Sequence, residues 1–330
     1  MKTLLCHWTP LHSAPRLARS AVAAIGICLV AANSGCSIKR LAINQLGDAL
    51  SNGTGTFATD DDPDLIRTAA PFSLKLMESL LAESPQHREL LQALASGFTQ
   101  YSFAFADQPA DELEDKDLVA ANMGHARAQR LYRRARNYGL RGLEVNHPGF
   151  EKRLRADPAA AVRVTKKADV HLLYWTAASW AAGISLSKDS PDAIADLPLA
   201  AALIDRALAL DERFDHGAIH SFLITFELAR PNAGPNAVAK ARQHFARAVE
   251  LSGGNQAGPF ISLAENVAVK EQNAVEFKAL LEKALAVKVD ARPEWRLVNT
   301  IMQRRAAWLL GRVDDLILPA LPPAETKTKP

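Results

Sequence analysis

Cysteine is scarce in this chain of 330 residues, and the three that it contains are Cys6, Cys28 and Cys36. A chain that begins at Cys36 would contain no second thiol, so disulfides, cysteine-based zinc sites and a cysteine nucleophile are excluded from the remainder. Catalytic motifs are missing as well, because the sequence has no Gly-rich phosphate loop, no GxSxG elbow and no HExxH. We therefore expect neither an enzyme nor a bound cofactor.

An excess of one charge sign is also absent once the N-terminal segment is set aside. The chain contains 39 Lys and Arg against 36 Asp and Glu, a formal net charge of +3. Removal of Lys2, Arg16 and Arg19 leaves 36 residues of each sign and a net charge of zero. A neutral chain gives no global electrostatic reason to expect nucleic acid or an anionic membrane surface as a partner.

Residues 1–35 have the composition of an export signal. Three basic residues and no acidic one precede an apolar run of 13 residues, Ser20–Ala32. At a rise of about 1.5 Å per residue, a helix of this length is too short for the hydrocarbon core of a bilayer, which is about 30 Å thick. The segment is therefore predicted to be a signal peptide.

A lipidation site is predicted directly after this segment. The sequence Asn33-Ser34-Gly35-Cys36 resembles the cleavage box of bacterial lipoproteins, although such boxes usually carry Leu where this chain has Asn33. We expect Cys36 to receive lipid and to become the first residue of a periplasmic protein. Since Ser37 replaces the aspartate that retains lipoproteins at the inner membrane, the outer membrane is favoured as the anchoring site. An ordinary cleavable signal or a retained anchor is the alternative.

A recurring pattern of apolar residues predicts the fold. Residues at spacings of four and three share one helical face in three segments. These faces are Ala200, Ile204 and Ala207; Ala241, Phe245 and Ala248; and Phe277, Leu281 and Ala284. The closing alanines are 41 and 36 residues apart, which is the range of helical hairpins that stack as repeats. No sustained two-residue alternation indicates strands, so we predict an all-α fold of tetratricopeptide-like hairpin repeats with insertions, an α-solenoid.

The order of these segments divides the chain into four predicted parts. They are a signal peptide, a lipidated cysteine with a flexible linker, a tetratricopeptide-like helical domain and a disordered tail, at residues 1–35, 36–59, 60–318 and 319–330. Within the helical domain, an acidic insertion at 107–117 and a second insertion at 147–167 interrupt the repeats. Residues 187–197 are predicted to form a loop.

Aromatic residues concentrate in two stretches of the helical domain. The candidates for lining a pore or apolar ligand site are Phe98, Tyr101, Phe105, Tyr174, Trp175 and Trp180. The second group lies in the segment 169–183, which is apolar almost all round and is therefore predicted to be buried or to line an apolar space. The alternative is that these rings belong to an ordinary hydrophobic core.

A helix predicted at 126–138 carries arginines on the face opposite its apolar stripe. Arg127, Arg130 and Arg134 are the candidate docking residues for an acidic protein or ligand. The alternative is a solvated face that is balanced by the acidic insertion just before it.

Metal binding is not expected in this sequence. His216 and His220 are four residues apart, a spacing that two ligands on one helical face would use, but no third ligand is evident. The aspartates at 60–62 lack the spaced ligands of a calcium hand. We expect Asp62 to cap a helix that begins at Pro63.

Four long stretches carry a family resemblance: GCSIKRLAINQLGDAL (35–50), FATDDDPDLIR (57–67), LAESPQHRELLQALASGFTQYSFAFA (81–106) and LLYWTAASWAAG (172–183). In this order they resemble the TatT proteins, the T components associated with tripartite ATP-independent periplasmic (TRAP) transporters. The resemblance extends over essentially the whole chain after Gly35 and supplies no catalytic residue.

The resemblance implies a lipid-anchored periplasmic protein of cryptic tetratricopeptide-like hairpins that forms a homotrimer with a pore through each protomer. It would associate with a substrate-binding P component, which passes an apolar ligand to a membrane permease. Two other functions remain open. Similar hairpins serve as scaffolds for envelope assembly or secretion, and a metal at His216 and His220 would indicate an envelope metalloenzyme.

Overall fold

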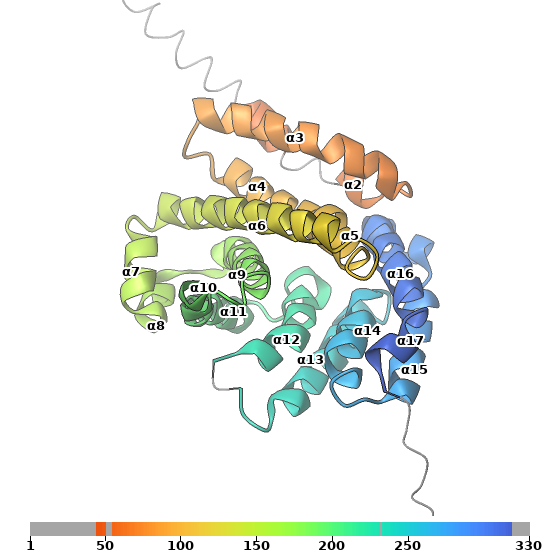
Figure 1. Ribbon diagram of the computed structural model, residues 1–330. Helices are drawn as coiled ribbons and strands as arrows, with labels where there is room; N and C mark the ends of the chain where they lie inside the picture. The colour runs from red at the N-terminus through yellow and green to blue at the C-terminus, as the bar shows by residue number, and fades with distance from the viewer. Residues whose placement is uncertain (1–43, 51–54, 232, 319–330) are drawn as a thin grey trace, which may run out of the picture. The chain divides into compact units, whose positions relative to one another are not determined.

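The computed structural model describes residues 44–50, 55–231 and 233–318, and every regular element among them is a helix (Figure 1). The all-α prediction is therefore confirmed for this part of the chain. The chain divides into two units, Met1–Leu46 and Gly47–Pro330, and every labelled element below belongs to the second. The predicted signal peptide, Cys36 and the predicted tail at 319–330 lie outside the described residues. Within the described residues, no helix combines the length and apolar character needed to cross a membrane.

Two antiparallel helices open the helical domain. Helix α3 spans Pro63–Glu83 and α4 spans Arg88–Ser102. The Asp62 side chain accepts hydrogen bonds from the backbone N–H of Asp64 and Leu65, and Pro63 is the first helical residue, which confirms the predicted N-cap. The described part of the predicted linker is also helical, at 44–50 and in α2, Gly55–Ala58.

The acidic insertion is partly helical. Helix α4 continues as a π-helix, η1 (Phe103–Asp107), and then as α5 (Gln108–Asp111), because the chain keeps helical dihedrals through both junctions. Helix α6 follows as Leu118–Asn146 and is much longer than the predicted 126–138. Its N-cap is Asp117, which accepts from the Ala120 N–H, and this cap signal lies within the segment assigned to the insertion.

Helix α9 (Val170–Ser185) packs closely under α6 (Figure 1). Two glycines of α6 permit this approach. A Cβ atom on Gly139 would lie 2.1 Å from the Thr176 Oγ1, and one on Gly142 would lie 2.6 Å from a Leu172 methyl carbon. The apolar character of α9 is therefore explained by burial against α6 on one side and α11 on another.

Short elements connect these longer helices. The second insertion contains α7, α8 and two 3-10 turns, at Phe150–Ala156, Pro158–Ala161, Val162–Val164 and Lys167–Asp169. The predicted loop at 187–197 was wrong in part, because it contains α10 (Pro191–Ala195), which Ser190 caps by accepting from the Ala193 N–H. Helix α11 then spans Leu197–Leu210.

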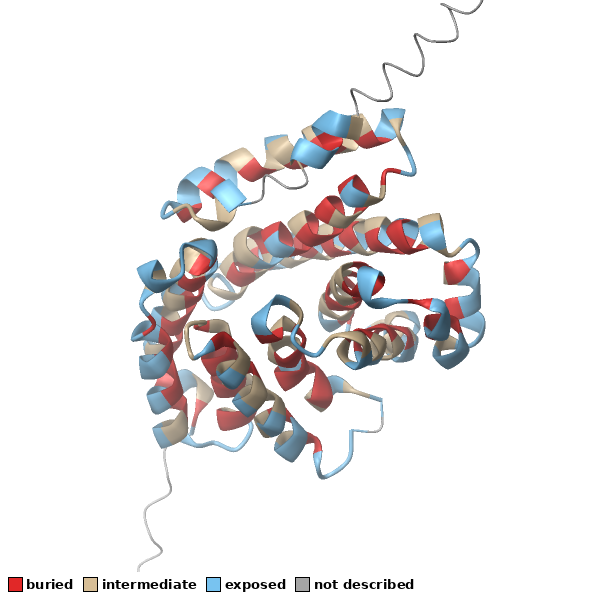
Figure 2. Ribbon diagram, turned by 180° about the vertical axis from the view of Figure 1, so that it is seen from behind, coloured by how far each residue is buried: buried red, intermediate tan, exposed pale blue. Residues whose placement is uncertain are grey.

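The second half of the domain consists of paired helices. They are η4 (Phe214–Gly217), α12 (Ala218–Ala229), α13 (Ala237–Ser252), α14 (Gly258–Leu263), the π-helix η5 (Ala264–Ala268), α15 (Ala274–Leu285), η6 (Val289–Ala291), η7 (Pro293–Trp295), α16 (Arg296–Leu310) and α17 (Val313–Leu316). The three predicted packing faces are buried except for Phe245, which is partly exposed. Buried positions run as stripes along the helices (Figure 2). Their stacking as tetratricopeptide-like repeats stays a prediction.

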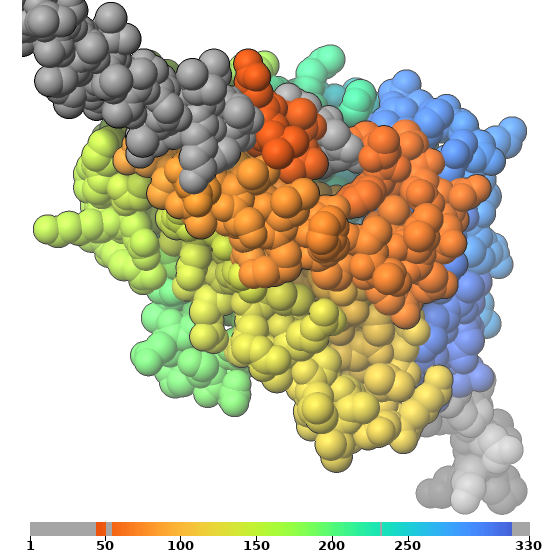
Figure 3. All heavy atoms as spheres, turned by 90° about the horizontal axis from the view of Figure 1, so that it is seen from above, coloured from red at the N-terminus to blue at the C-terminus, as the bar shows by residue number. Residues whose placement is uncertain are grey.

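The last long helix contacts the first ones. Helix α16 packs on α2 and α3, and the C-terminal helices, in blue, lie against the orange N-terminal helices in Figure 3. The buried Arg305 of α16 forms ion pairs with Asp111 (2.9 Å) and Glu265 (2.7 Å). Arg296 donates to the Thr59 carbonyl at 3.1 Å. Polar contacts thus join residues that are almost 200 or more positions apart in the sequence.

Candidate functional site

A group of aromatic side chains from three elements forms the candidate site, here called the aromatic cluster. It consists of His171, Tyr174 and Trp175 of α9, Phe214 of η4 and Phe222 of α12. The residues of α9 share one helical face because they are three and four positions apart. Ring centroids are 4.9 Å apart for Tyr174 and Trp175, and 5.3 Å apart for Tyr174 and Phe214.

These rings are partly exposed although they pack against the core of α9, α11 and α12. Burial nevertheless raises the pKa of Tyr174, and burial with the nearby Arg88 charge lowers the pKa of His171 to about 4. Burial also raises the pKa of Asp215, although its side chain is exposed. The cluster is therefore a partly exposed aromatic surface whose rings contact one another.

An unusual backbone holds Asp215 at this surface. Asp215, His216 and Gly217 have φ angles of 43°, 53° and 97°, so three consecutive residues are in the left-handed region. A Cβ atom on Gly217 would also lie 3.1 Å from the Leu251 Cβ and 3.3 Å from the Ala248 Cα of α13. The His216 ring contacts Trp295 edge-on at 5.0 Å. Such strain persists only where the surrounding structure fixes it.

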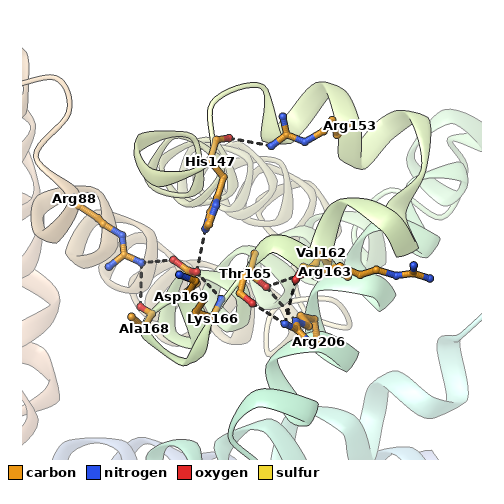
Figure 4. A network of polar contacts seen from close by, with 10 residues as sticks. All are labelled: Arg88, His147, Arg153, Val162, Arg163, Thr165, Lys166, Ala168, Asp169 and Arg206. Carbon is orange, nitrogen blue, oxygen red and sulfur yellow. Dashed lines mark hydrogen bonds and ion pairs between the residues drawn. The ribbon is translucent and has the colours of Figure 1, made fainter.

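A polar network fixes the start of α9, which carries three residues of the cluster (Figure 4). The Oδ1 of the buried Asp169 accepts from Arg88 of α4 at 2.8 Å. Its Oδ2 accepts from the Lys166 N–H at 2.8 Å and lies 3.0 Å from the His147 Nε2. Burial acts to raise the pKa of Asp169, but these hydrogen bonds and the two cationic neighbours outweigh it and lower the pKa. The carboxylate therefore joins α4, α6 and α9.

A second part of the same network joins α11 to the segment before α9. The Arg206 guanidinium donates to the Thr165 carbonyl at 2.6 Å and to its hydroxyl at 3.3 Å (Figure 4). This contact and the Asp169 contacts lie on either side of the turn that leads into α9. They explain how a segment of short helices can position the aromatic cluster.

The structure separates the predicted pore residues into different environments. Tyr174 and Trp175 belong to the aromatic cluster. Phe98, Tyr101 and Phe105 pack in the core of α3, α4 and α6, where Phe98 stacks on Tyr138 at 6.0 Å. Trp180 is buried in the core against which Tyr174 packs, and it donates to the Asp196 carboxylate at 3.1 Å. A role for any of them in ligand binding stays a prediction.

Sequence reasoning missed His171, Phe214, Asp215 and Phe222. The only local signal was the Asp-His-Gly sequence at 215–217, in which a glycine follows residues that tolerate positive φ. Contact between α9 and η4 depends on the tertiary fold, so no spacing rule within one helix could have found this site.

The three predicted docking arginines differ in the contacts that they make with other side chains. Arg127 donates to the Tyr101 hydroxyl at 3.3 Å, and Arg134 pairs with the buried Glu78 and lies 4.9 Å from the centre of the Phe98 ring. Arg130 is exposed. Two of these side chains therefore stabilise contacts between helices, and the docking role stays a prediction.

Among the residues that the structure describes, two groups of side chains have the chemistry to hold a metal. Ligand atoms of Asp107, Asp111 and His125 lie within 4.8 Å of one another, as do those of Asp48, His87 and Glu89. In the first group the Tyr132 hydroxyl donates to Asp107 at 2.8 Å and Arg305 pairs with Asp111, so protein donors already serve both carboxylates. Burial still raises the pKa of Asp111 to about 6.

The histidine pair considered in the sequence is divided between two places. His216 contacts Trp295, whereas the buried His220 shares a hydrogen bond with His244, with 2.8 Å between their Nδ1 atoms. Burial lowers the pKa of both members of this second pair. The close contact suits one shared proton better than two imidazolium groups.

Comparison with known proteins gives a match over most of the chain. Residues 59–317 match the model of the family described as TRAP transporter T-component, TAtT. An uncharacterized protein from Treponema pallidum (strain Nichols) is 29% identical over 317 residues, which cover 89% of this chain and 96% of the relative. The family match includes α3 to α16 and the whole aromatic cluster.

Proposed function

The chain belongs to the TRAP transporter T-component family, and from this premise we propose that it is a non-enzymatic accessory component that binds a periplasmic solute-binding P component. In the proposed arrangement, the aromatic cluster receives the apolar part of a ligand that the P component carries. The family resemblance first read from the sequence is thereby confirmed, whereas the partner and the ligand are part of the proposal.

The aromatic cluster is the observation that supports a ligand-binding role. Its five rings are partly exposed and contact one another across α9, η4 and α12. Aromatic surfaces of this kind bind apolar ligands because the rings bury a large area at a small loss of side-chain entropy. A core built only for stability would gain more by burying these rings completely.

The proposal extends to assembly and location. The protein would be anchored through lipid at Cys36 in the periplasm, with the outer membrane favoured, and would form a homotrimer of tetratricopeptide-like protomers. Arg127, Arg130 and Arg134 lie along one helix, α6, and are proposed to face an acidic surface of the P component.

Binding to a purified TRAP-type solute-binding protein from the same organism tests the proposed function. Native mass spectrometry of the chain, alone and with that protein, should give a trimer and a complex that contains both proteins. A monomer that ignores the solute-binding protein but binds purified assembly or secretion proteins would contradict the proposal and favour the scaffold function.

A further inference from the structure

A histidine of α6 is surrounded by carboxylates of the acidic insertion, whose helix α5 lies against α6 (Figure 1). The His125 Nδ1 lies 3.3 Å from the Asp107 Oδ1. Its Nε2 lies 3.2 Å from the Glu114 Oε1 and 3.7 Å from the Asp111 Oδ1. A neutral imidazole carries one proton and can donate from only one nitrogen. The other nitrogen of a neutral His125 therefore turns a lone pair towards carboxylate oxygen.

The burial of the carboxylates decides which nitrogen keeps the proton. The Asp107 side chain is 16% exposed, whereas that of Glu114 is 56% exposed. A buried carboxylate has lost more of its hydration and depends more on a protein donor, which places the proton on Nδ1. The Nε2 lone pair then faces Asp111 and Glu114. A histidine that donates one nitrogen to a carboxylate and presents the other is oriented as metal-binding histidines are.

The outer oxygens of both aspartates are held by other side chains. The Tyr132 hydroxyl donates to the Asp107 Oδ2 at 2.8 Å, and Arg305 pairs with the Asp111 Oδ2 at 2.9 Å. These contacts leave the Oδ1 atom of each aspartate directed at His125. Ligating carboxylates are commonly fixed in this way, through the oxygen that does not bind the metal.

The distances and the charges both suit a bound cation. Two ligands that are each about 2.1 Å from a tetrahedral zinc ion lie about 3.4 Å apart, and the two distances from the His125 Nε2 lie on either side of this value. Among the described residues, Arg305 is the only Lys or Arg in ion-pair contact with any of Asp107, Asp111 and Glu114. It also pairs with Glu265, so its single charge is shared.

We propose that the His125 Nε2, the Asp111 Oδ1 and the Glu114 Oε1 bind a divalent transition-metal ion, with water as a fourth ligand. Asp107 is a positioning residue that holds the imidazole through Nδ1. An imidazole with two carboxylates suits Zn²⁺ better than Ca²⁺ or Mg²⁺, which prefer oxygen ligands alone. The ion joins the acidic insertion to α6, and its site is independent of ligand binding at the aromatic cluster.

Zinc titration of the full chain tests this site. Isothermal titration after removal of metal with a chelator compares the wild type with Glu114→Gln and Glu112→Gln. Both variants remove one negative charge from the same turn, but of the two residues Glu114 is the one that contacts His125. We expect Glu114→Gln to weaken Zn²⁺ binding at least about tenfold and Glu112→Gln to change it less than about threefold. Equal losses would overturn the inference, because a diffuse acidic surface would explain both.

Three further variants distinguish this site from other groups that bind metals. Asp107→Asn should weaken Zn²⁺ binding by about tenfold through the orientation of the ring, and His125→Gln should abolish it. Glu89→Gln alters the second group of candidate ligands and should leave the affinity unchanged. Unchanged binding in the His125 variant, or a loss in the Glu89 variant alone, would overturn the inference.

The choice of metal provides a separate readout. Ca²⁺ should bind at least about tenfold more weakly than Zn²⁺, because imidazole is a poor ligand for calcium. Co²⁺ in place of zinc should give a visible spectrum without a thiolate charge-transfer band. Equal affinity for Ca²⁺ and Zn²⁺, or a thiolate band, would overturn the inference in favour of the acidic segment as a whole or of the cysteines. The proposed function would stand in either case, because binding of the P component is measured separately.

Discussion

Two polar regions of this protein differ in whether their charged groups are paired. Around Arg305, buried charges pair with one another: the guanidinium contacts Asp111 and Glu265 and lies 4.4 Å from the centre of the Trp308 ring. In the aromatic cluster, the exposed Asp215 carboxylate forms no ion pair with the described residues, and the His171 Nδ1 is buried without a hydrogen-bond partner. A network of paired charges indicates a structural role, whereas partly exposed aromatic rings provide a surface for binding. The two regions therefore separate what holds the fold together from what is available to a ligand.

The largest expected effect on stability comes from removing the ion pairs of Arg305. Arg305→Met should lower the free energy of unfolding by about 3 kcal/mol, because two partly buried carboxylates would lose their cation. Arg304→Met is the matched control, since Arg304 is exposed and its contact with Asp64 is 3.6 Å long. Urea unfolding at neutral pH measures both variants. Equal stability of the two would show that the Arg305 network does not stabilise the fold.

A smaller loss is expected from the backbone that positions the cluster. Gly217→Ala should lower the free energy of unfolding by about 2 kcal/mol, because alanine disfavours positive φ and its Cβ would crowd α13. Gly234→Ala is the control, since a Cβ there would meet no atom within 4 Å. Affinity for 1-decanol, used as an apolar probe, should fall in the first variant alone. A stable Gly217 variant that binds normally would mean that this backbone conformation is not required.

A fall in pH should lower the free energy of unfolding through protonation of His171. Its pKa in the folded protein, about 4, is below its ordinary value of 6.5, so its contribution to stability is complete above pH 6.5 and is lost as the pH falls towards 4. His171→Gln should remove about 1 kcal/mol of the stability difference between pH 7 and pH 5, a value reduced for the partial exposure of the ring. Urea unfolding at the two pH values measures this. An identical pH dependence in the wild type and the variant would contradict it.

The smallest effect on stability is expected at the docking arginines. Their substitution separates a role in the fold from a role in binding the P component. Arg130→Ala should change the free energy of unfolding by less than about 0.5 kcal/mol, because the residue is exposed. Arg134→Ala should cost about 1 kcal/mol, because Glu78 loses one of its two cationic partners and keeps only Lys75. Titration with the P component should show weaker binding for both. If only the Arg134 variant bound more weakly, its effect would be structural and the docking proposal would fail.

The sequence predicted local features better than distant contacts. The spacing of Ala200, Ile204 and Ala207 indicated a packing face that the structure buries completely, because helical periodicity is a property of a short segment. The full length of α6 was missed because its first turns are capped within an acidic segment. The apolar character of α9 indicated burial correctly.

Only part of the candidate site could be predicted, because its residues come from segments that are distant in the sequence. Tyr174 and Trp175 could be named from the aromatic content of one helix, but Phe214 and Asp215 come from a strained turn about 40 residues further along. Grouping Phe98 and Trp180 with them rested on residue type alone. The structure instead gives these two rings partners in separate cores.

The contacts of α16 with the first helices have a consequence for how this fold can evolve. In an open helical array each repeat touches only its neighbours, so the number of repeats changes easily during evolution. Here Arg305 must reach Asp111, and Arg296 must reach the Thr59 carbonyl. Deletion or duplication of one hairpin between α6 and α16 would move these partners apart. The contacts between the two ends of the domain thus constrain how many hairpins can lie between them. Changes in length are easier to accommodate in the loops and short helices.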